Sequence, residues 1–180
     1  MNNQKNEIMG KEAVKISKLD VDKLLKEMNA ALAEEWLAYY QYWIGARVME
    51  GQMRSNIEPE LLKHADEELH HAEMLVERIK QLDGVPLLSP KEWFTHAQCA
   101  YETPTDFYIE RILEQNLRGE RCAIERYQHI AEYTIGKDYA TYRMAVEILE
   151  DEIDHEDDIE SWMADFRRMR EDFLQVKERV

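Results

Sequence analysis

Apolar residues recur at intervals of three and four positions along four long segments of the chain. This spacing is that of one face of an α-helix, and it predicts four helices, near residues 20–50, 59–82, 104–135 and 138–166. Asp20 is suited to cap the first helix and Pro59 to open the second. Gly51 and Gly136 follow the first and third helices, where glycine commonly ends a helix.

The connections between these helices predict how they pack. Short turns at 51–57 and 136–138 indicate two antiparallel hairpins. The second connection, residues 84–103, is long enough to travel the length of a bundle, and Ser89 followed by Pro90 predicts a short capped helical turn within it. The predicted fold is therefore all-α: a four-helix bundle with a long crossover that contains a short helix between helices 2 and 3.

The whole chain, residues 1–180, has the size of one domain. We expect residues 1–17 to be a frayed arm and residues 168–180 to be a charged tail. No apolar run approaches the roughly 18 residues that span a bilayer, and the first residues lack the apolar core of a signal peptide. These features predict a cytoplasmic protein without a membrane segment.

Acidic residues outnumber basic ones by 38 to 23, giving a formal charge of -15. This balance argues against a nucleic-acid-binding body and favours affinity for cations. Only the lysine-bearing arm at residues 1–17 favours DNA binding, so we expect none. Two cysteines, Cys99 and Cys122, are too few for a disulfide scaffold or a four-cysteine metal site.

The apolar stripes are interrupted by carboxylates and imidazoles at positions that face the core. A charged group there costs several kcal/mol unless it is paired, and a metal ion suits a carboxylate and an imidazole together. A single Glu-x-x-His is more often part of a solvated acidic face, so the motif alone decides little. The residues at stripe positions are Glu35, Glu68, His71, Glu120, Glu152 and His155.

The same pattern occurs twice in the chain. Glu35 lies 33 residues before the first Glu-x-x-His pair, and Glu120 lies 32 residues before the second. Each of these acids is followed seven residues later by a tyrosine, Tyr42 or Tyr127. Two such hairpins packed about a pseudo-twofold axis would bring four carboxylates and two imidazoles to one level of the core.

That donor set predicts two divalent cations, iron or manganese rather than structural zinc. Each cation would receive one lone glutamate and one histidine, and the glutamates of the two Glu-x-x-His pairs would bridge them. We expect Tyr42 and Tyr127 to hydrogen-bond the carboxylates rather than to form radicals. Glu114 is an alternative ligand from the third helix, although it breaks the repeat. The remaining candidates are predicted at the surface: His64, Glu67, His70, His96 and His129.

With these residues in place, the chain resembles the ferritin-like superfamily over all but its termini. Residues 71–79 and 147–155 are similar to bacterioferritin. A closer resemblance is to the Dps-like proteins of archaea and anaerobic bacteria, also called thioferritins. Its most specific part is the pair of cysteines, supported by residues 119–124 and 133–138.

The resemblance implies a ferroxidase that uses two iron ions per subunit, with manganese or zinc able to replace them in vitro. Members oxidise Fe(II) at an intrasubunit di-iron centre, preferably with hydrogen peroxide rather than oxygen. They store ferric iron in a hollow dodecamer and protect against oxidative stress. In this pattern Glu35 and Glu120 are terminal ligands, whereas Glu68 and Glu152 bridge.

The resemblance also bears on a haem site, on the two cysteines and on the alternative functions. Leu69 stands where the haem methionine of bacterioferritin is expected, so we predict no haem. Cys99 and Cys122 would form a disulfide or a redox-active pair close to the metal site but outside its ligand set. A rubrerythrin-type di-iron peroxidase without iron storage would use the same ligands, and a purely structural bundle would bind no metal tightly.

Overall fold

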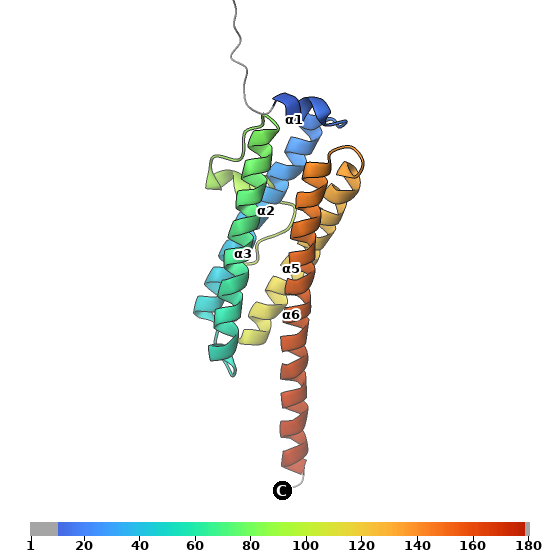
Figure 1. Ribbon diagram of the computed structural model, residues 1–180. Helices are drawn as coiled ribbons and strands as arrows, with labels where there is room; N and C mark the ends of the chain where they lie inside the picture. Colours follow the sequence, from blue (N-terminus) through green and yellow to red (C-terminus); the bar gives the residue numbers. More distant parts are fainter. Residues whose placement is uncertain (1–10, 179–180) are drawn as a thin grey trace, which may run out of the picture.

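Four long helices lie side by side in the computed structural model, which describes residues 11–178 (Figure 1). The first two and the last two form antiparallel hairpins, and no strand occurs within this range. The all-α bundle predicted from the sequence is therefore confirmed. Its long helices are α2 (Val21–Val48), α3 (Arg54–Gln81), α5 (Ile109–Thr134) and α6 (Tyr139–Glu178).

The beginnings of α2 and α3 show where the cap predictions succeeded and failed. Asp20 caps α2 as predicted, because its carboxylate accepts a hydrogen bond of 3.1 Å from the backbone N–H of Lys23. The prediction that Pro59 opens the second helix is wrong, since α3 begins five residues earlier at Arg54. A proline in the second turn removes only one backbone hydrogen bond, which a long packed helix tolerates.

The third long helix, by contrast, begins later than predicted, at Ile109 instead of near residue 104. The chain before it is extended and pairs with the turn between α2 and α3. Glu50 N–H donates to the carbonyl of Phe107 at 2.7 Å, and Ile109 N–H donates to the carbonyl of Glu50 at 2.9 Å. These hydrogen bonds satisfy backbone N–H and C=O groups of residues 107–109, which therefore do not need a helical turn to find partners.

The described residues reach into both of the predicted chain ends. Residues 11–16 form a short helix, α1 (Lys11–Ile16), whereas residues 1–10 of the expected arm lie outside the described range. The tail expected from residue 168 continues α6, and its side chains are exposed as far as residue 175. This end of α6 projects beyond the other helices (Figure 1). Its residues have high helix propensity, so the helix continues without burial.

The crossover contains the predicted capped turn. Ser89 accepts a hydrogen bond from the backbone of Lys91, and Glu92 accepts one from the backbone of Ser89, which together make a capping box. The 3₁₀ turn η1 (Pro90–Glu92) and helix α4 (Trp93–His96) follow. Trp93 stacks on Trp36 of α2 with ring centres 5.3 Å apart, which holds the crossover against the bundle.

The buried stripes form two apolar clusters at different levels of the bundle. One cluster includes Leu24, Leu75 and Ile148, and the other includes Leu61 and Phe166. Most positions at the three- and four-residue spacing of these stripes are buried, whereas Tyr39, Ala123 and Trp162, which have the same spacing, are half-buried. Along all four helices the acidic and histidine interruptions fall between the two clusters.

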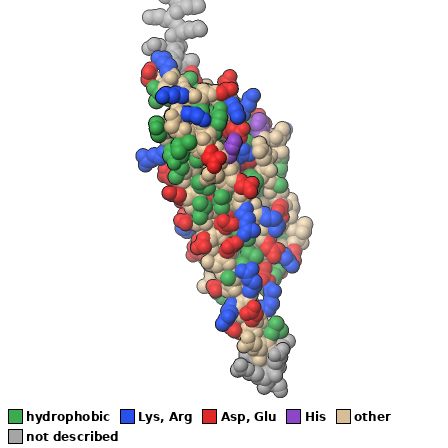
Figure 2. Space-filling model, turned by 90° about the vertical axis from the view of Figure 1, so that its right-hand side faces the viewer, with side chains coloured by type: hydrophobic (Ala, Val, Ile, Leu, Met, Phe, Trp, Pro, Cys, Tyr) green, Lys and Arg blue, Asp and Glu red, His purple; other side chains and the backbone are tan. Residues whose placement is uncertain are grey.

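One face of the bundle carries charged side chains of both signs. Figure 2 views the molecule from the right of Figure 1 and shows acidic and basic side chains mixed along the bundle. Arg121 of α5, for example, pairs with Glu156 of α6 at 2.7 Å. Within residues 11–178, no helix is long and apolar enough to cross a membrane.

Candidate metal centre

Six acidic and histidine side chains meet between the two apolar clusters. They come from all four long helices, and none is more than 3% exposed. Their donor atoms fall into two groups whose members all lie within 4.8 Å of one another. One group contains Glu35, Glu68, His71 and Glu152, and the other contains Glu68, Glu120, Glu152 and His155.

The first group surrounds the inner nitrogen of one histidine. His71 Nδ1 lies 3.2 Å from Glu152 Oε1, 3.4 Å from Glu68 Oε2 and 3.5 Å from Glu35 Oε2. Glu35 contributes to this group alone. This end of the cluster therefore combines one imidazole with three carboxylates from α2, α3 and α6.

The second group repeats this arrangement around the other histidine. His155 Nδ1 lies 3.4 Å from Glu152 Oε2, 3.5 Å from Glu68 Oε1 and 3.7 Å from Glu120 Oε2. Glu68 and Glu152 thus each direct one oxygen toward His71 and the other toward His155. A carboxylate placed in this way can bridge two cations.

Carboxylates outside the cluster orient the two imidazoles. His71 Nε2 lies 3.1 Å from Asp151, and His155 Nε2 lies 3.1 Å from Glu67. When Nε2–H donates to these carboxylates, the lone pair of each ring is on Nδ1 and points into the cluster. The prediction that Glu67 points away is wrong, because its side chain is long enough to reach across to α6.

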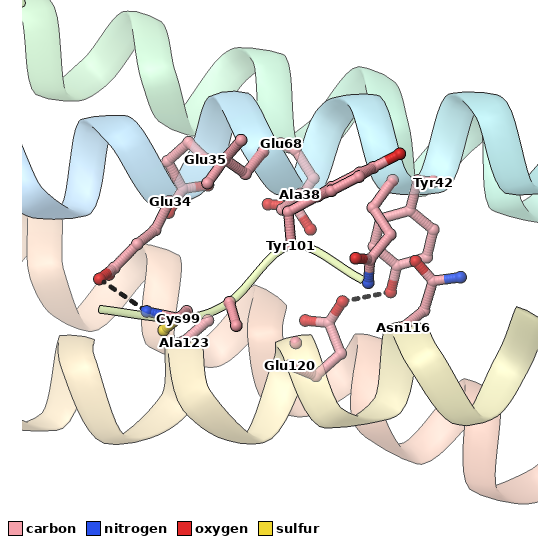
Figure 3. A pocket seen from close by; sticks show the side chains of 14 residues that line it. Glu34, Glu35, Ala38, Tyr42, Glu68, Cys99, Tyr101, Asn116, Glu120 and Ala123 are labelled. Carbon is pink, nitrogen blue, oxygen red and sulfur yellow. Dashed lines mark hydrogen bonds between the residues drawn. The ribbon is translucent and has the colours of Figure 1, made fainter. Parts of the chain in front are cut away.

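Two buried tyrosines hold the remaining carboxylates in place. Tyr42 of α2 donates a hydrogen bond to Glu120 of α5, and Tyr127 of α5 donates one to Glu35 of α2. Each tyrosine therefore contacts the acid of the opposite hairpin, as Figure 3 shows for Tyr42 and Glu120. Burial raises the pKa of both tyrosines well above the usual value, so they remain donors.

The donor atoms that face one another have no hydrogen-bond partner among the described residues. Buried polar atoms without partners are costly and rare in folded proteins. Two ligands at about 2.1 Å from one divalent cation lie roughly 3.0–3.4 Å apart, close to the spacing of these atoms. The residues present therefore fit a pair of divalent cations. The atoms are Glu35 Oε2, Glu68 Oε1, Glu120 Oε2, both carboxylate oxygens of Glu152, and Nδ1 of His71 and His155.

The same groups hold protons when no cation is bound. Burial raises the pKa of Glu35 to about 8, against the effect of the nearby His71. Burial also raises the pKa of Glu152 well above its usual value, together with the neighbouring Glu68 and Glu120 carboxylates. For His71, burial lowers the pKa, but the surrounding carboxylates outweigh it and the pKa is raised. Cation binding must therefore release protons.

A narrow pocket leads to the cluster between α2 and α5. It is lined by Glu35, Glu68 and Glu120 from the cluster and by residues 99–101 of the crossover. In Figure 3, Glu34 and Cys99 lie at one end of this pocket, and Tyr42 and Glu120 lie at the other. The crossover is thus part of the wall of the candidate metal centre.

All six cluster residues lie in a part of the chain that matches a known protein family. A family model described as "Ferritin-like domain" matches residues 25–169, which contain every cluster residue. This chain belongs to the ferritin-like family. The resemblance inferred from the sequence is therefore confirmed, and with it the coarse function of the family, which is iron storage with ferroxidase activity.

Three relatives locate this ferritin-like chain more closely. A "DNA protection during starvation protein" of Pyrococcus furiosus is 41% identical over 146 residues, covering 77% of this chain and 75% of the relative. A bacterioferritin of Brucella melitensis is 28% identical over 141 residues, covering 77% and 81%. A solved structure from Bacteroides fragilis, described as a dodecameric thioferritin and a bacterioferritin-related protein, is 53% identical. It has a TM-score of 0.90 and covers 91% of this chain and 99% of its own.

A disulfide in this ferritin-like chain ties the crossover to α5 beside the pocket. It joins Cys99 to Cys122, whose Cα atoms are 5.8 Å apart. Glu34, buried on α2, reinforces the attachment by accepting hydrogen bonds from the backbone of Gln98 at 2.7 Å and from Arg126 at 2.9 Å. Glu34 could not be picked out from the sequence, because it lies next to the stripe position Glu35 in an acidic dipeptide.

The positions of Glu114 and His64 in the structure test two further predictions. Glu114, the alternative ligand, pairs with Arg111 at 2.7 Å and belongs to neither donor group. The prediction that His64 lies at the surface is wrong, since its side chain is 0% exposed. His64 lies one turn before Glu68 on α3, so the helix carries it into the bundle next to His155. His70, His96 and His129 are exposed as expected.

Proposed function

We propose that this ferritin-like chain oxidises Fe(II) at the six-residue cluster, preferably with hydrogen peroxide, and stores the ferric product in a dodecameric cage. The observation that carries the proposal is the position of Glu68 and Glu152, each of which directs one oxygen toward His71 and one toward His155. Two Fe(II) ions held by shared carboxylates can react together.

The reaction consumes both ions as substrates. Two Fe(II) give one electron each to one hydrogen peroxide, which takes up two protons and becomes two molecules of water, leaving two Fe(III). Because both electrons are delivered together, no hydroxyl radical is released. Glu35 and Glu120 would each hold one ion, and Tyr42 and Tyr127 would keep these two carboxylates oriented.

Assembly into a cage is supported by the relative from Bacteroides fragilis and by exposed aromatic residues. Tyr40 lies 6.1 Å from Trp43 and from Tyr101 between ring centres, and Phe94 lies 6.3 Å from Tyr101. Tyr40, Trp43 and Phe94 are 46%, 38% and 68% exposed. Aromatic groups gathered on a surface favour a protein contact, so we propose that this patch is covered by another subunit.

Anaerobic titration followed by oxidant addition tests the function. We expect tight Fe(II) binding to saturate at two ions per chain, followed by oxidation of two Fe(II) for each peroxide and faster reaction with peroxide than with oxygen. Twelve chains of 21.5 kDa give a particle of 258 kDa, which should gain mass as iron is loaded.

Two results would contradict this proposal. A particle of 43 kDa, the mass of two chains, with peroxide consumption and no iron loading would favour the rubrerythrin-type alternative. The absence of tight cation binding would favour a structural bundle. The cytoplasmic location and the lack of haem stay predictions.

We also propose that Cys99 and Cys122 are redox-active: when the disulfide forms, the two thiols give two electrons and two protons to one hydrogen peroxide, which becomes two molecules of water. The disulfide fixes the crossover at the wall of the pocket. Changing both residues, Cys99→Ser with Cys122→Ser, is therefore expected to lower peroxide turnover and iron loading severalfold. Stopped-flow assays compare this variant with wild type in its dithiol form and in its disulfide form, and equal rates in all three would exclude a role for the pair.

A further inference from the structure

The disulfide between Cys99 and Cys122 borders two hollows in the protein. The pocket that leads to the metal centre is lined by Cys99 and not by Cys122. A second hollow of about 360 Å³, here called the outer hollow, is lined by both cysteines. Both residues are only half-buried, and a disulfide within reach of solvent is open to attack by another thiol. The other residues that line the outer hollow are Glu27, Gln98, Glu125, Arg126 and His129.

Three parts of the fold form the outer hollow. From α5 come Cys122 and the residues three, four and seven positions after it, which lie on one face of the helix. Glu27 comes from α2, and Gln98 comes from the crossover. Because both cysteines line this hollow, a molecule in it reaches the disulfide without entering the pocket of the metal centre. Its volume is that of a site for a small molecule.

The charged groups around the outer hollow favour a cation. Arg126 Nε donates to Glu34 at 2.9 Å, and another nitrogen of the same guanidinium donates to Glu27 at 2.9 Å. Glu125 adds a third carboxylate, which is exposed. Three carboxylates thus surround a single guanidinium. A small thiol that carries an ammonium group is attracted by this excess of negative charge, whereas a thiol that carries a sulfonate is repelled.

We propose that the outer hollow is the site at which a small, positively charged thiol reduces the Cys99–Cys122 disulfide. A first thiol loses its proton to water, and its sulfur bonds to one cysteine while the other cysteine leaves as a thiolate and takes up a proton. A second thiol attacks the mixed disulfide in the same way. The products are two protein thiols and one small-molecule disulfide, so two electrons pass from the reductant to the protein.

The position of Cys99 connects this reduction to the metal centre. Cys99 lines both hollows, so reduction from the outside leaves a thiol at the wall of the inner pocket, where Figure 3 shows Cys99. The use of that thiol against peroxide rests on the proposed function. The reduction itself requires neither iron nor peroxide and can be tested without them.

The test compares two thiols of equal length and opposite charge, 2-aminoethanethiol and 2-mercaptoethanesulfonate. The metal-free disulfide form of the whole protein is treated with each at pH 8, where free imidazole is uncharged. New protein thiols are alkylated and counted by mass spectrometry. The same pair of rates on bis(2-hydroxyethyl) disulfide corrects for the different nucleophilicities of the two thiols. After this correction, we expect wild type to prefer the cationic thiol about tenfold.

Reversing one charge in the outer hollow should reduce this preference. Glu125→Lys changes an exposed residue, so the fold should be retained, and the preference is expected to fall about fivefold or more. Glu132→Lys makes the same change on α5 outside the hollow, about 15 Å along the helix from Cys122, and should have a much smaller effect because salt screens it. A wild-type preference equal to that of the reference disulfide, or equal effects of the two variants, would overturn the charge-selective site.

Filling the hollow tests the route of the thiol. Gln98→Trp places a large side chain in the outer hollow and is expected to slow both thiols at least about fivefold, whereas Gln128→Trp changes an exposed residue of α5 outside the hollow and should leave both rates unchanged. Equal rates in these two variants would mean that thiols reach the disulfide by another route, which overturns the inference. Loss of tight Fe(II) binding would contradict the proposed function and leave these thiol rates as expected.

Discussion

The Glu152→Gln variant is expected to lose both tight cation positions and to oxidise Fe(II) more than about 100-fold more slowly. Even a residue that only hydrogen-bonds a metal ligand contributes about 10- to 100-fold to affinity or activity, and Glu152 faces both halves of the cluster. Its oxygens lie 3.2 Å from His71 Nδ1 and 3.4 Å from His155 Nδ1. Cobalt or zinc binding and stopped-flow Fe(II) oxidation measure the two effects.

Two matched variants make this expectation specific. Glu35→Gln changes a residue that faces His71 alone, so we expect it to lose one tight position and keep the other. Glu156→Gln changes a carboxylate one turn further along α6 that pairs with Arg121, and it is expected to keep both. Retention of one tight cation by Glu152→Gln would show that this residue does not bridge.

The Arg78→Met variant is expected to lower the free energy of unfolding of the metal-free protein by about 3–5 kcal/mol, the usual cost of breaking a buried ion pair. Arg78 is 7% exposed. It donates to both oxygens of Asp138 at 2.9 Å and to Thr141 at 2.8 Å. Removing the Arg78 guanidinium leaves the carboxylate of Asp138, at the start of α6, buried without a positively charged partner. Urea unfolding at one fixed protein concentration measures the change.

The same measurement includes an internal comparison. Arg118→Met breaks an exposed pair with Glu102 and is expected to cost about 1 kcal/mol or less. Combining Arg78→Met with Asp138→Asn removes the stranded charge and should recover much of the loss, while the amide can still cap α6. An effect of Arg78→Met no larger than that of Arg118→Met would mean that water screens the buried pair.

The six cluster residues could be predicted from the sequence because the spacing of apolar residues shows which positions of each helix face the core. A helix face repeats every three or four residues, so a buried glutamate or histidine stands out among apolar neighbours. The doubled spacing then separated Glu68 and Glu152 from ordinary surface acids. Helix ends were harder to predict, as Pro59 shows, because several competing hydrogen-bond arrangements differ little in energy.

Residues that depend on contacts between distant segments could not be predicted in this way. Glu34 is buried by the crossover that it binds, and Asp138 is buried by Arg78 from another hairpin. His64 has the three- and four-residue spacing of the α3 stripe, from Leu61 and to Glu68, but it lies next to Ala65, which fits the same stripe, and its burial against His155 shows which way it faces. Each of these side chains resembles a surface residue until the helices are placed together.

The exchange of hydrogen bonds by Tyr42 and Tyr127 has a consequence for how such a centre can be encoded. Neither hairpin orients its own lone glutamate, since each glutamate receives its hydrogen bond from the other hairpin. Two identical hairpins related by a twofold axis would make the same exchange. A gene of half this length, translated into a self-associating hairpin, could therefore assemble a complete centre before any duplication joined the two copies.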